Sequence, residues 1–255
     1  MSLDFGPALR EWRQQRRMSQ LDLGLSANVS ARHISFLETG RARPSRSMVL
    51  QLCEELEVPR AARNRLLTAA GLAPAYGARG LSEDEMAPVR DAVDWMLQRH
   101  VPYPGMALDR HWHLVSLNTP AARLLGPLGL GAGASLLEAL AGHDGLRAAI
   151  ANLDEVIRHT ITRLRTESAH LGGDPVLDAA VARFAAEVGP EGRGEMGVMP
   201  PVIPTRYRMG EVELALFSTL AQFGTAEDVA LAELKIELMF PADETTRRLL
   251  EAAAG

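Results

Sequence analysis

The stretch SQLDLGLSANVSARHISFLETGRARPS, residues 19–45, decides the fold of the first part of the chain. Ser19 is followed three residues later by Asp22, the spacing of a capping box, which predicts a helix over about residues 20–27. Ser30 has the position of an N-cap for a second short helix, which Gly40 ends. Two short helices joined by a tight turn form a supersecondary unit that proteins use to enter a DNA groove.

Three further helices flank this pair. An apolar stripe from Phe5 to Trp12 at helical spacing predicts a first helix, Pro44-Ser45 opens a fourth, and Pro59 opens a fifth that Gly71 ends. In the fourth helix the inward positions fall on four residues: Val49, Leu52, Cys53 and Leu56. The first seventy residues are therefore expected to form an all-α bundle of five helices.

The helix that begins at Ala31 has an outward face without bulky apolar side chains. Ile34 and Leu37 point inward, which leaves four small or hydrogen-bonding residues outside: Ala31, Arg32, His33 and Ser35. Such side chains near a helix N-terminus can enter a major groove, and Arg32 can offer two donors to a guanine edge.

Residues 4–70 resemble the helix-turn-helix of phage-repressor (XRE) proteins in the order and spacing of these motifs. The resemblance implies that Gln20 begins the helix that crosses the DNA backbone, where it contacts phosphate or braces the third helix. It also implies that Arg13 and Glu38 pair between the first and third helices. It also implies a DNA-binding set of ten residues: Gln20, Ser30, Ala31, Arg32, His33, Ser35, Arg41, Arg43, Ser45 and Arg46. Gly24 departs from the family, which usually has alanine there. Some relatives of this motif only bind proteins, so that alternative stays open.

Charge is distributed unevenly along the 255 residues, whose formal net charge is -5. Residues 1–70 carry 11 arginines and 7 acids, a balance of +4, so the remainder carries -9. A basic head suggests a polyanionic partner. No apolar run approaches the ~18–20 residues of a membrane span, and residues 1–10 lack the apolar stretch of a secretory signal. With Cys53 as the single cysteine, we expect a cytoplasmic protein that uses no membrane and no disulfide.

The boundary between domains is expected in the Pro-, Gly- and Ala-rich segment 73–81. This gives a helix-turn-helix domain over 1–72 and a second domain over 82–255. Ser82 and Glu85 have capping-box spacing, so a helix is predicted over about residues 83–99.

The second domain alternates between strand and helix signals. A hairpin is predicted from residues 105–109 and 112–118, and three later strands from alternating apolar residues near 205–209, 212–216 and 234–240. Helical segments fill about 135–188, and a last helix spans about 243–254. The expected fold class is α+β, with about five antiparallel strands and helices on one face.

That arrangement resembles a PAS-type sensor, and the whole chain resembles an MmyB-like transcription regulator. The resemblance is carried by HVPYP at 100–104, LDRHWHLVSLN at 108–118, FSTLAQFGT at 217–225 and residues 233–241. It implies a DNA operator as one partner and a small apolar effector, such as a fatty acid, as another. Candidate ligand-binding residues are Trp112, Leu114, Asn118, Leu124, Phe217, Leu220 and Phe223, although for any single one of them ordinary core is the better interpretation.

The sequence favours no enzyme, cofactor or metal. His111 and His113 could share a strand face, but no carboxylate or thiol completes a ligand set. The glycine-rich run 189–194 lacks a phosphate-binding pattern and is interpreted as a loop. An enzyme fused to a DNA-binding head remains an alternative.

The expected assembly is a homodimer. Two related heads would meet successive major grooves ~34 Å apart, and the 83–99 helix is expected to contribute to the contact.

Overall fold

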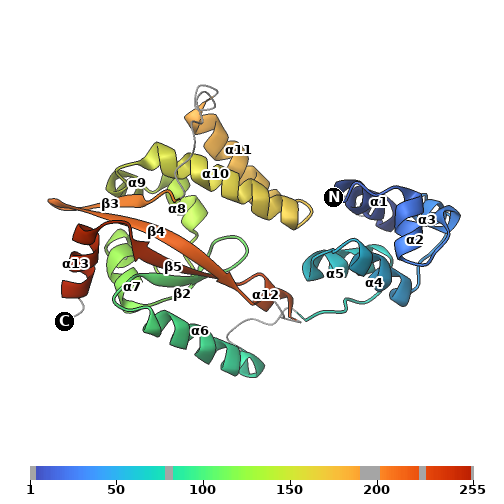
Figure 1. Cartoon of the computed structure of the whole chain (residues 1–255), viewed down its shortest axis with the longest axis horizontal. Helices are drawn as coiled ribbons and strands as arrows, with labels where there is room; N and C mark the ends of the chain where they lie inside the picture. The colour runs from blue at the N-terminus through green and yellow to red at the C-terminus, as the bar shows by residue number, and fades with distance from the viewer. Residues whose placement is uncertain (1–3, 78–82, 190–201, 224–227, 254–255) are drawn as a thin grey trace. The chain divides into compact units, whose positions relative to one another are not determined.

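The computed structural model describes residues 4–77, 83–189, 202–223 and 228–253 (Figure 1). The chain divides into two compact units, one built mainly on residues 1–78 and one on most of the remainder. We call residues 4–77 the head and the described residues from 83 onward the body. Ser82 of the predicted capping box and residues 190–194 of the predicted glycine-rich loop lie outside the described residues.

The head is the five-helix bundle that the sequence predicts. Its helices are α1 (Phe5–Gln15), α2 (Gln20–Ser26), α3 (Ala31–Glu38), α4 (Arg46–Glu55) and α5 (Arg60–Ala69). Ser19, Ser30 and Ser45 cap α2, α3 and α4, and each hydroxyl accepts a hydrogen bond from the backbone N–H three residues on. These short helices begin where the serines place them.

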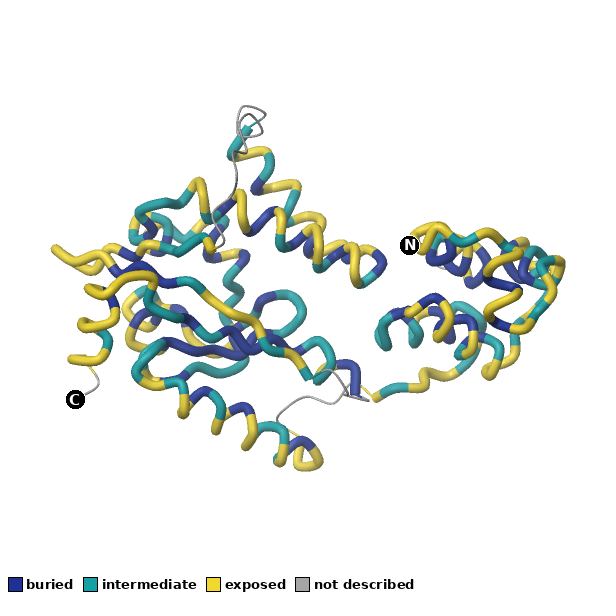
Figure 2. Tube along the Cα trace, viewed as in Figure 1, coloured by how far each residue is buried: buried dark blue, intermediate teal, exposed yellow. Residues whose placement is uncertain are grey.

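The core of the head gathers one apolar stripe from each helix. Trp12, Leu23, Ile34, Leu37 and Leu56 are fully buried in it. Figure 2 shows such buried segments along every helix of the bundle. Since helices this short are marginal alone, their stability comes from this shared core.

Gly24 lets α2 approach the turn before α3. A Cβ atom placed on Gly24 would lie 2.6 Å from the Val29 carbonyl oxygen and 3.1 Å from the Ala31 nitrogen. The same Val29 donates its backbone N–H to the Gly24 carbonyl at 2.7 Å. The position therefore demands a residue without a side chain, which explains the departure from alanine.

The body is built on a five-stranded antiparallel sheet with strand order β2-β1-β5-β4-β3. Its strands are β1 (Gly105–Leu108), β2 (Leu114–Leu117), β3 (Thr205–Met209), β4 (Val212–Gln222) and β5 (Lys235–Pro241). The first two strands form the predicted hairpin, and β5 joins β1 to β4: Leu238 is opposite Gly105 on one side and opposite Thr219 on the other. The split of two and three strands around a helical insert is confirmed.

The remaining helices lie before, within and after the sheet. They are α6 (Ala87–Arg99), α7 (Thr119–Leu125), α8 (Leu136–Gly142), α9 (Asp144–Ala149), α10 (Leu153–His170), α11 (Pro175–Val188), α12 (Val229–Ala232) and α13 (Glu244–Ala252), with two 3-10 turns at Asp84–Met86 and Gly126–Leu128. The helix predicted over 83–99 thus begins as a 3-10 turn and becomes α-helical at Ala87.

Helices cover both faces of this sheet, whereas the sequence predicted helices on one face. Val93 and Leu97 of α6 pack with Ala107 and Ile236. Successive strand residues point to opposite faces, so Glu237 faces away from α6, and its carboxylate meets Arg163 of α10. Figure 1 shows α6 and α10 on the two sides of the sheet.

The two-sided cover explains the burial of polar residues on β5. Lys235 and Glu237 alternate with apolar residues, a pattern typical of a strand with one solvated face. Both are nevertheless buried, with exposed fractions of 3% and 8%. Alternation alone could not show that α10 would cover the polar face.

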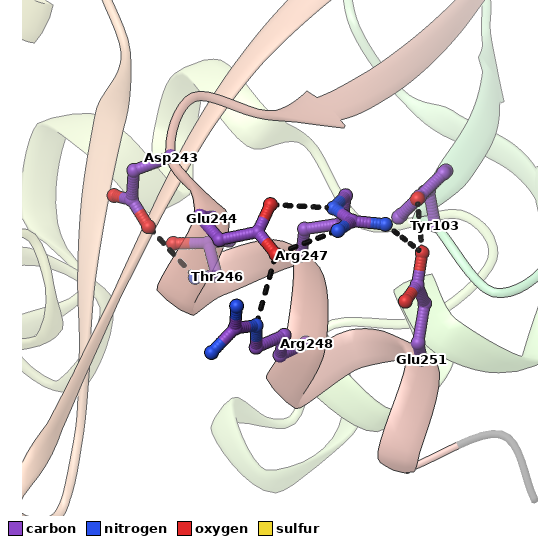
Figure 3. A network of polar contacts seen from close by, with 7 residues as sticks. All are labelled: Tyr103, Asp243, Glu244, Thr246, Arg247, Arg248 and Glu251. Atoms are coloured by element: carbon purple, nitrogen blue, oxygen red, sulfur yellow. Dashed lines mark hydrogen bonds and ion pairs between the residues drawn. The ribbon is translucent and has the colours of Figure 1, made fainter.

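The last helix, α13, is fixed to β4 by one threonine. Thr246 is fully buried, and its hydroxyl accepts a hydrogen bond from the Ala215 N–H at 3.0 Å. The Asp243 carboxylate accepts the Thr246 N–H and caps the helix. On the exposed side Arg247 bridges Glu244 and Glu251, and Tyr103 donates to Glu251 (Figure 3).

Candidate functional sites

The N-terminal half of α3 presents a polar face. Arg32 is exposed, Ala31, His33 and Ser35 are half-buried, and Ile34 is fully buried. The Arg32 guanidinium carbon lies 5.2 Å from the centroid of the Phe36 ring, in cation–π range. Of the four residues that the sequence placed on the outward face, the structure thus leaves Arg32 exposed and the other three half-buried.

A buried polar contact holds α3 against α1 and α2. Arg13 donates to both carboxylate oxygens of Glu38, at 2.6 and 3.0 Å, and Gln20 donates to Glu38 at 2.8 Å. Burial alone would raise the pKa of Glu38, but the hydrogen bonds from Arg13 and Gln20 outweigh burial and lower that pKa. Of the two roles that the sequence gave Gln20, the structure shows the bracing contact.

The loop after α3 and the first residue of α4 carry three arginines. Arg41, Arg43 and Arg46 are exposed. Arg46 donates to the carbonyl oxygens of Ala73 and Pro74, at 2.6 and 3.3 Å. Ser30 and Ser45 serve as helix caps. The backbone N–H groups that donate hydrogen bonds to their hydroxyls lie at the exposed starts of α3 and α4. Arg41 and Arg43 are therefore the guanidinium groups of this loop best placed for phosphates.

A cavity of about 130 Å³ lies in the body between the sheet and the helices from α8 to α10. Its apolar wall includes Met106 and Met239 of the sheet and Leu137, Leu140 and Ile150 opposite. Its polar wall includes residues of α10 and the strands: His159, Thr160, Arg163, Thr205, Tyr207, Ser218 and Glu237. A mostly apolar pocket with a few polar groups at one place is typical of a small-molecule site.

The polar end of this cavity is an aromatic ring beside an ion pair. Arg163 donates to Glu237 at 3.2 Å, and the two side chains are 16% and 10% exposed. The Arg163 guanidinium carbon lies 4.1 Å from the Trp112 ring centroid, and Lys235 Nζ lies 4.9 Å from the same centroid. Partial burial, and then the nearby Arg163, lower the pKa of His159 below its ordinary value of 6.5, although the residue as a whole is exposed.

Of the seven ligand-binding residues predicted from sequence, Trp112 lines this cavity. Leu124 lines a second cavity, of about 160 Å³, beside α7 and α13. Leu114 is buried at 1% exposure, Leu220 is 45% exposed, and Phe223 packs with the α6 cluster. Phe217 stacks on Phe240, with ring centroids 5.7 Å apart. The structure does not bring these seven residues together.

Asn118 has a role in the framework. It is fully buried, and its carbonyl oxygen accepts from the N–H groups of Gly105 and Ala121. Its amide donates to the carbonyls of Leu97 and Tyr103, both at 2.9 Å. Asn118 thus joins α6, β1 and α7, and its side-chain amide already makes four hydrogen bonds within the protein.

Sequence reasoning missed Arg163, Glu237 and His159. Arg163 and His159 lie in a long helix, where a charged residue is ordinarily solvated. Their four-residue spacing, which puts them on one helix face, was the available signal. Nothing in the sequence indicated which strand that face would cover.

His111 and His113 precede β2 and do not share a strand face, contrary to the sequence interpretation. Their backbone N–H groups both donate to Asp109 Oδ1, and His113 Nδ1 lies 3.1 Å from Asp109 Oδ2. Among the residues that the structure describes, no three His, Cys, Asp or Glu side chains are grouped to hold a metal. Burial raises the pKa of Cys53 to about 12, so this thiol stays protonated.

Within the described ranges, none of the helices is long and apolar enough to cross a membrane.

Comparison with known proteins bears on both units. Residues 4–66 match a helix-turn-helix domain model, and residues 89–253 match the model of the MmyB-like transcription regulator ligand binding domain. No curated protein matches the chain. One similar solved chain is described as "Structure of an RNA-binding Light-Oxygen-Voltage Receptor", with 12% identity and a TM-score of 0.28. The match covers 98% of this chain and 60% of that one, and at this TM-score it carries no argument.

The two domain matches follow one another along the chain with the order and fold that the structure shows. The chain belongs to the MmyB-like transcription regulators, with a helix-turn-helix head followed by an α+β ligand-binding domain.

Proposed function

We propose that α3 reads an operator in the major groove and that a small effector with an apolar, fatty-acid-like chain, bound in the body, controls this binding. The observation that carries the proposal is the amphipathic division of α3, with Arg32 exposed and Ile34 and Leu37 fully buried. Arg32 pairs with a guanine edge, while Arg41 and Arg43 contact phosphates. Such a role places the protein in the cytoplasm.

The cavity between the sheet and α10 supports the effector half of the proposal. Its volume of about 130 Å³ is close to that of an engineered apolar cavity that binds benzene, ~150 Å³. A short alkyl chain therefore fits along Met106, Leu137 and Ile150, with its head at Arg163 and Glu237. The effector changes DNA binding only to the extent that it binds one arrangement of the protein better than another.

A homodimer completes the proposal, with α6 as a contact. Trp95 is 62% exposed, and the exposed residues Asp91 and Arg99 lie four positions before and after it. In an antiparallel pair of α6 helices with the twofold axis at Trp95, Asp91 meets Arg99 of the partner subunit at both ends. The charge pattern of this face is thus complementary to itself.

Fluorescence anisotropy with labelled DNA from the promoter beside the protein's own gene tests the DNA half. We expect binding that weakens steeply with salt and exceeds binding to shuffled DNA at least a hundredfold. Equal binding to both DNAs contradicts operator recognition. Absence of any binding would favour the protein-docking alternative for the head.

Native mass spectrometry of the purified full chain tests the assembly and the effector together. We expect a dimer mass and a co-purified small molecule. Incubation of the protein with that molecule, followed by a search for product, separates an effector from a substrate. An accumulating product would support the alternative of an enzyme fused to the head.

A further inference from the structure

The pocket beside α10 contains its own counter-ion, and this limits which head group it accepts. Arg163 and Glu237 are the Arg, Lys, Asp and Glu side chains among the described residues that line it, and the lowered pKa of His159 favours the uncharged form of that imidazole. They lie 3.2 Å apart, and both side chains are nearly buried. The formal charge of the lining therefore cancels before any ligand enters.

The neighbouring cations lie outside the lining of the cavity. Lys235 Nζ lies against the Trp112 ring and donates to the Arg110 carbonyl at 3.4 Å. Arg110 donates to both carboxylate oxygens of Glu233, at 2.9 and 3.1 Å. Neither cation lines the cavity, so Arg163 is the cation that a bound head group would meet.

A ligand carboxylate would be placed beside Glu237. It would compete with Glu237 for the Arg163 guanidinium, and the two like charges would repel at short range. An uncharged polar head meets no such repulsion. It can exchange hydrogen bonds with the hydroxyls of Thr160, Ser218 and Tyr207, which also line the cavity.

We propose that this pocket selects chain-like ligands with an uncharged hydrogen-bonding head, such as an alcohol, amide or ester, over the corresponding carboxylate. The selection comes from Glu237, which occupies the position that a carboxylate would otherwise take beside Arg163. This inference rests on the proposed function, because it assumes that the effector binds in this pocket.

Hexan-1-ol and hexanoate are the probes, because they share one alkyl chain and suit the volume of the cavity. Calorimetric titration of the full chain at pH 8, where hexanoate is ionised and His159 neutral, gives both dissociation constants. We expect hexan-1-ol to bind wild-type protein at least tenfold more tightly than hexanoate. In Glu237→Gln the acid no longer meets the Glu237 charge beside Arg163, so the preference should fall at least tenfold or reverse.

Glu213→Gln is the matched control. Glu213 is also a strand glutamate opposite an arginine, 3.7 Å from Arg206, but its side chain is 46% exposed and does not line the cavity. The Glu213→Gln protein should prefer hexan-1-ol over hexanoate by the same factor as the wild type. If circular dichroism shows that Glu237→Gln does not fold, the wild-type ratio decides alone.

Two results overturn the inference: wild-type protein that binds hexanoate as tightly as hexan-1-ol, or binds neither probe at millimolar concentration. A folded Glu237→Gln protein with an unchanged preference also overturns the role of Glu237. The anisotropy assay on the same preparation separates a failure of the head-group selection from a failure of the proposed function. Operator binding that persists when the probes fail rejects the head-group selection alone.

Discussion

The Arg13 guanidinium on α1 lies 2.6 Å from the Glu38 carboxylate on α3, and their side chains are 10% and 3% exposed. The pair connects the first helix of the head to the end of the helix that carries Arg32. Gln20 of α2 donates to the same carboxylate. One acidic group thus fixes the positions of three helices.

Removing the charge of Glu38 should destabilise the head strongly. In Glu38→Gln the buried Arg13 loses its counter-ion, which costs about 3–5 kcal/mol. Hydrogen exchange of peptides from residues 5–69, measured by mass spectrometry, reports this loss locally. Glu54→Gln is the control, because the Glu54 side chain in the pair with Arg63 is 72% exposed and the pair contributes about 0–1 kcal/mol. Equal effects of the two variants would contradict the assigned importance of the buried pair.

Glu38 should also make the head sensitive to acid. Its pKa in the folded head is lower than its ordinary value of 4.5, so the unfolded chain binds the proton more readily. The resulting stabilisation is fully present above about pH 4.5 and is lost as pH falls through the lower folded pKa. Protection of α1 and α3 against exchange should fall over this range in wild-type protein and less steeply in Glu38→Gln. Parallel pH profiles would argue against this assignment.

Arg32 and Arg43, on the proposed DNA face, should differ in the kind of DNA contact that they make. Arg32→Ala should weaken operator binding by about 1–3 kcal/mol and relax the preference at one base pair, since Arg32 is assigned to a guanine edge. Arg43→Ala should weaken binding to all sequences alike and reduce the salt slope by about one. Anisotropy titrations on operator and single-base variants at several salt concentrations measure both effects. Uniform losses for Arg32→Ala would remove it from base reading.

Alanine at position 24 should be harmful although it favours helices. The gain in helix propensity is about 1 kcal/mol, whereas the new Cβ would meet the Val29 carbonyl oxygen at 2.6 Å. We expect a net destabilisation of about 1–3 kcal/mol, seen as faster exchange in α2 and α3. Gly126→Ala is the control, because a Cβ there has nothing within 4 Å. A Gly24→Ala head as stable as the wild type would show that the turn can move.

The proposed α6 contact predicts a charge-reversal pattern. Asp91→Arg and Arg99→Asp should each weaken the dimer roughly tenfold, because a twofold axis applies each change at both ends of the contact. The double variant exchanges the charges and should restore dimerisation. Sedimentation equilibrium measures the dimer dissociation constants of the two single variants and of the double variant. A double variant weaker than both single variants would exclude this antiparallel pairing.

The head follows closely from its sequence because local signals there determine its structure. Ser19, Ser30 and Ser45 begin three helices, and the apolar stripes lead to one core. The outward position of Arg32 follows from helical periodicity once Ile34 and Leu37 are assigned to the core.

The ligand pocket could not be predicted in the same way. Its polar residues come from α10 and β5, which meet only through the tertiary packing of a long helical insert onto the sheet. Glu237 has the alternation typical of a solvated strand face, and Asn118 has the polarity of a ligand contact. The structure places the first in the interior and uses the second to join backbone segments.

The junction at Asn118 has a consequence for signalling within the body. Met106 of β1 lines the cavity, and Asn118 holds the adjacent Gly105 and the end of α6 with one side-chain amide. Separating these segments would break buried hydrogen bonds that no solvent replaces. A displacement of β1 by an incoming molecule would therefore be transmitted rigidly to α6, and from there to whatever neighbour that helix touches.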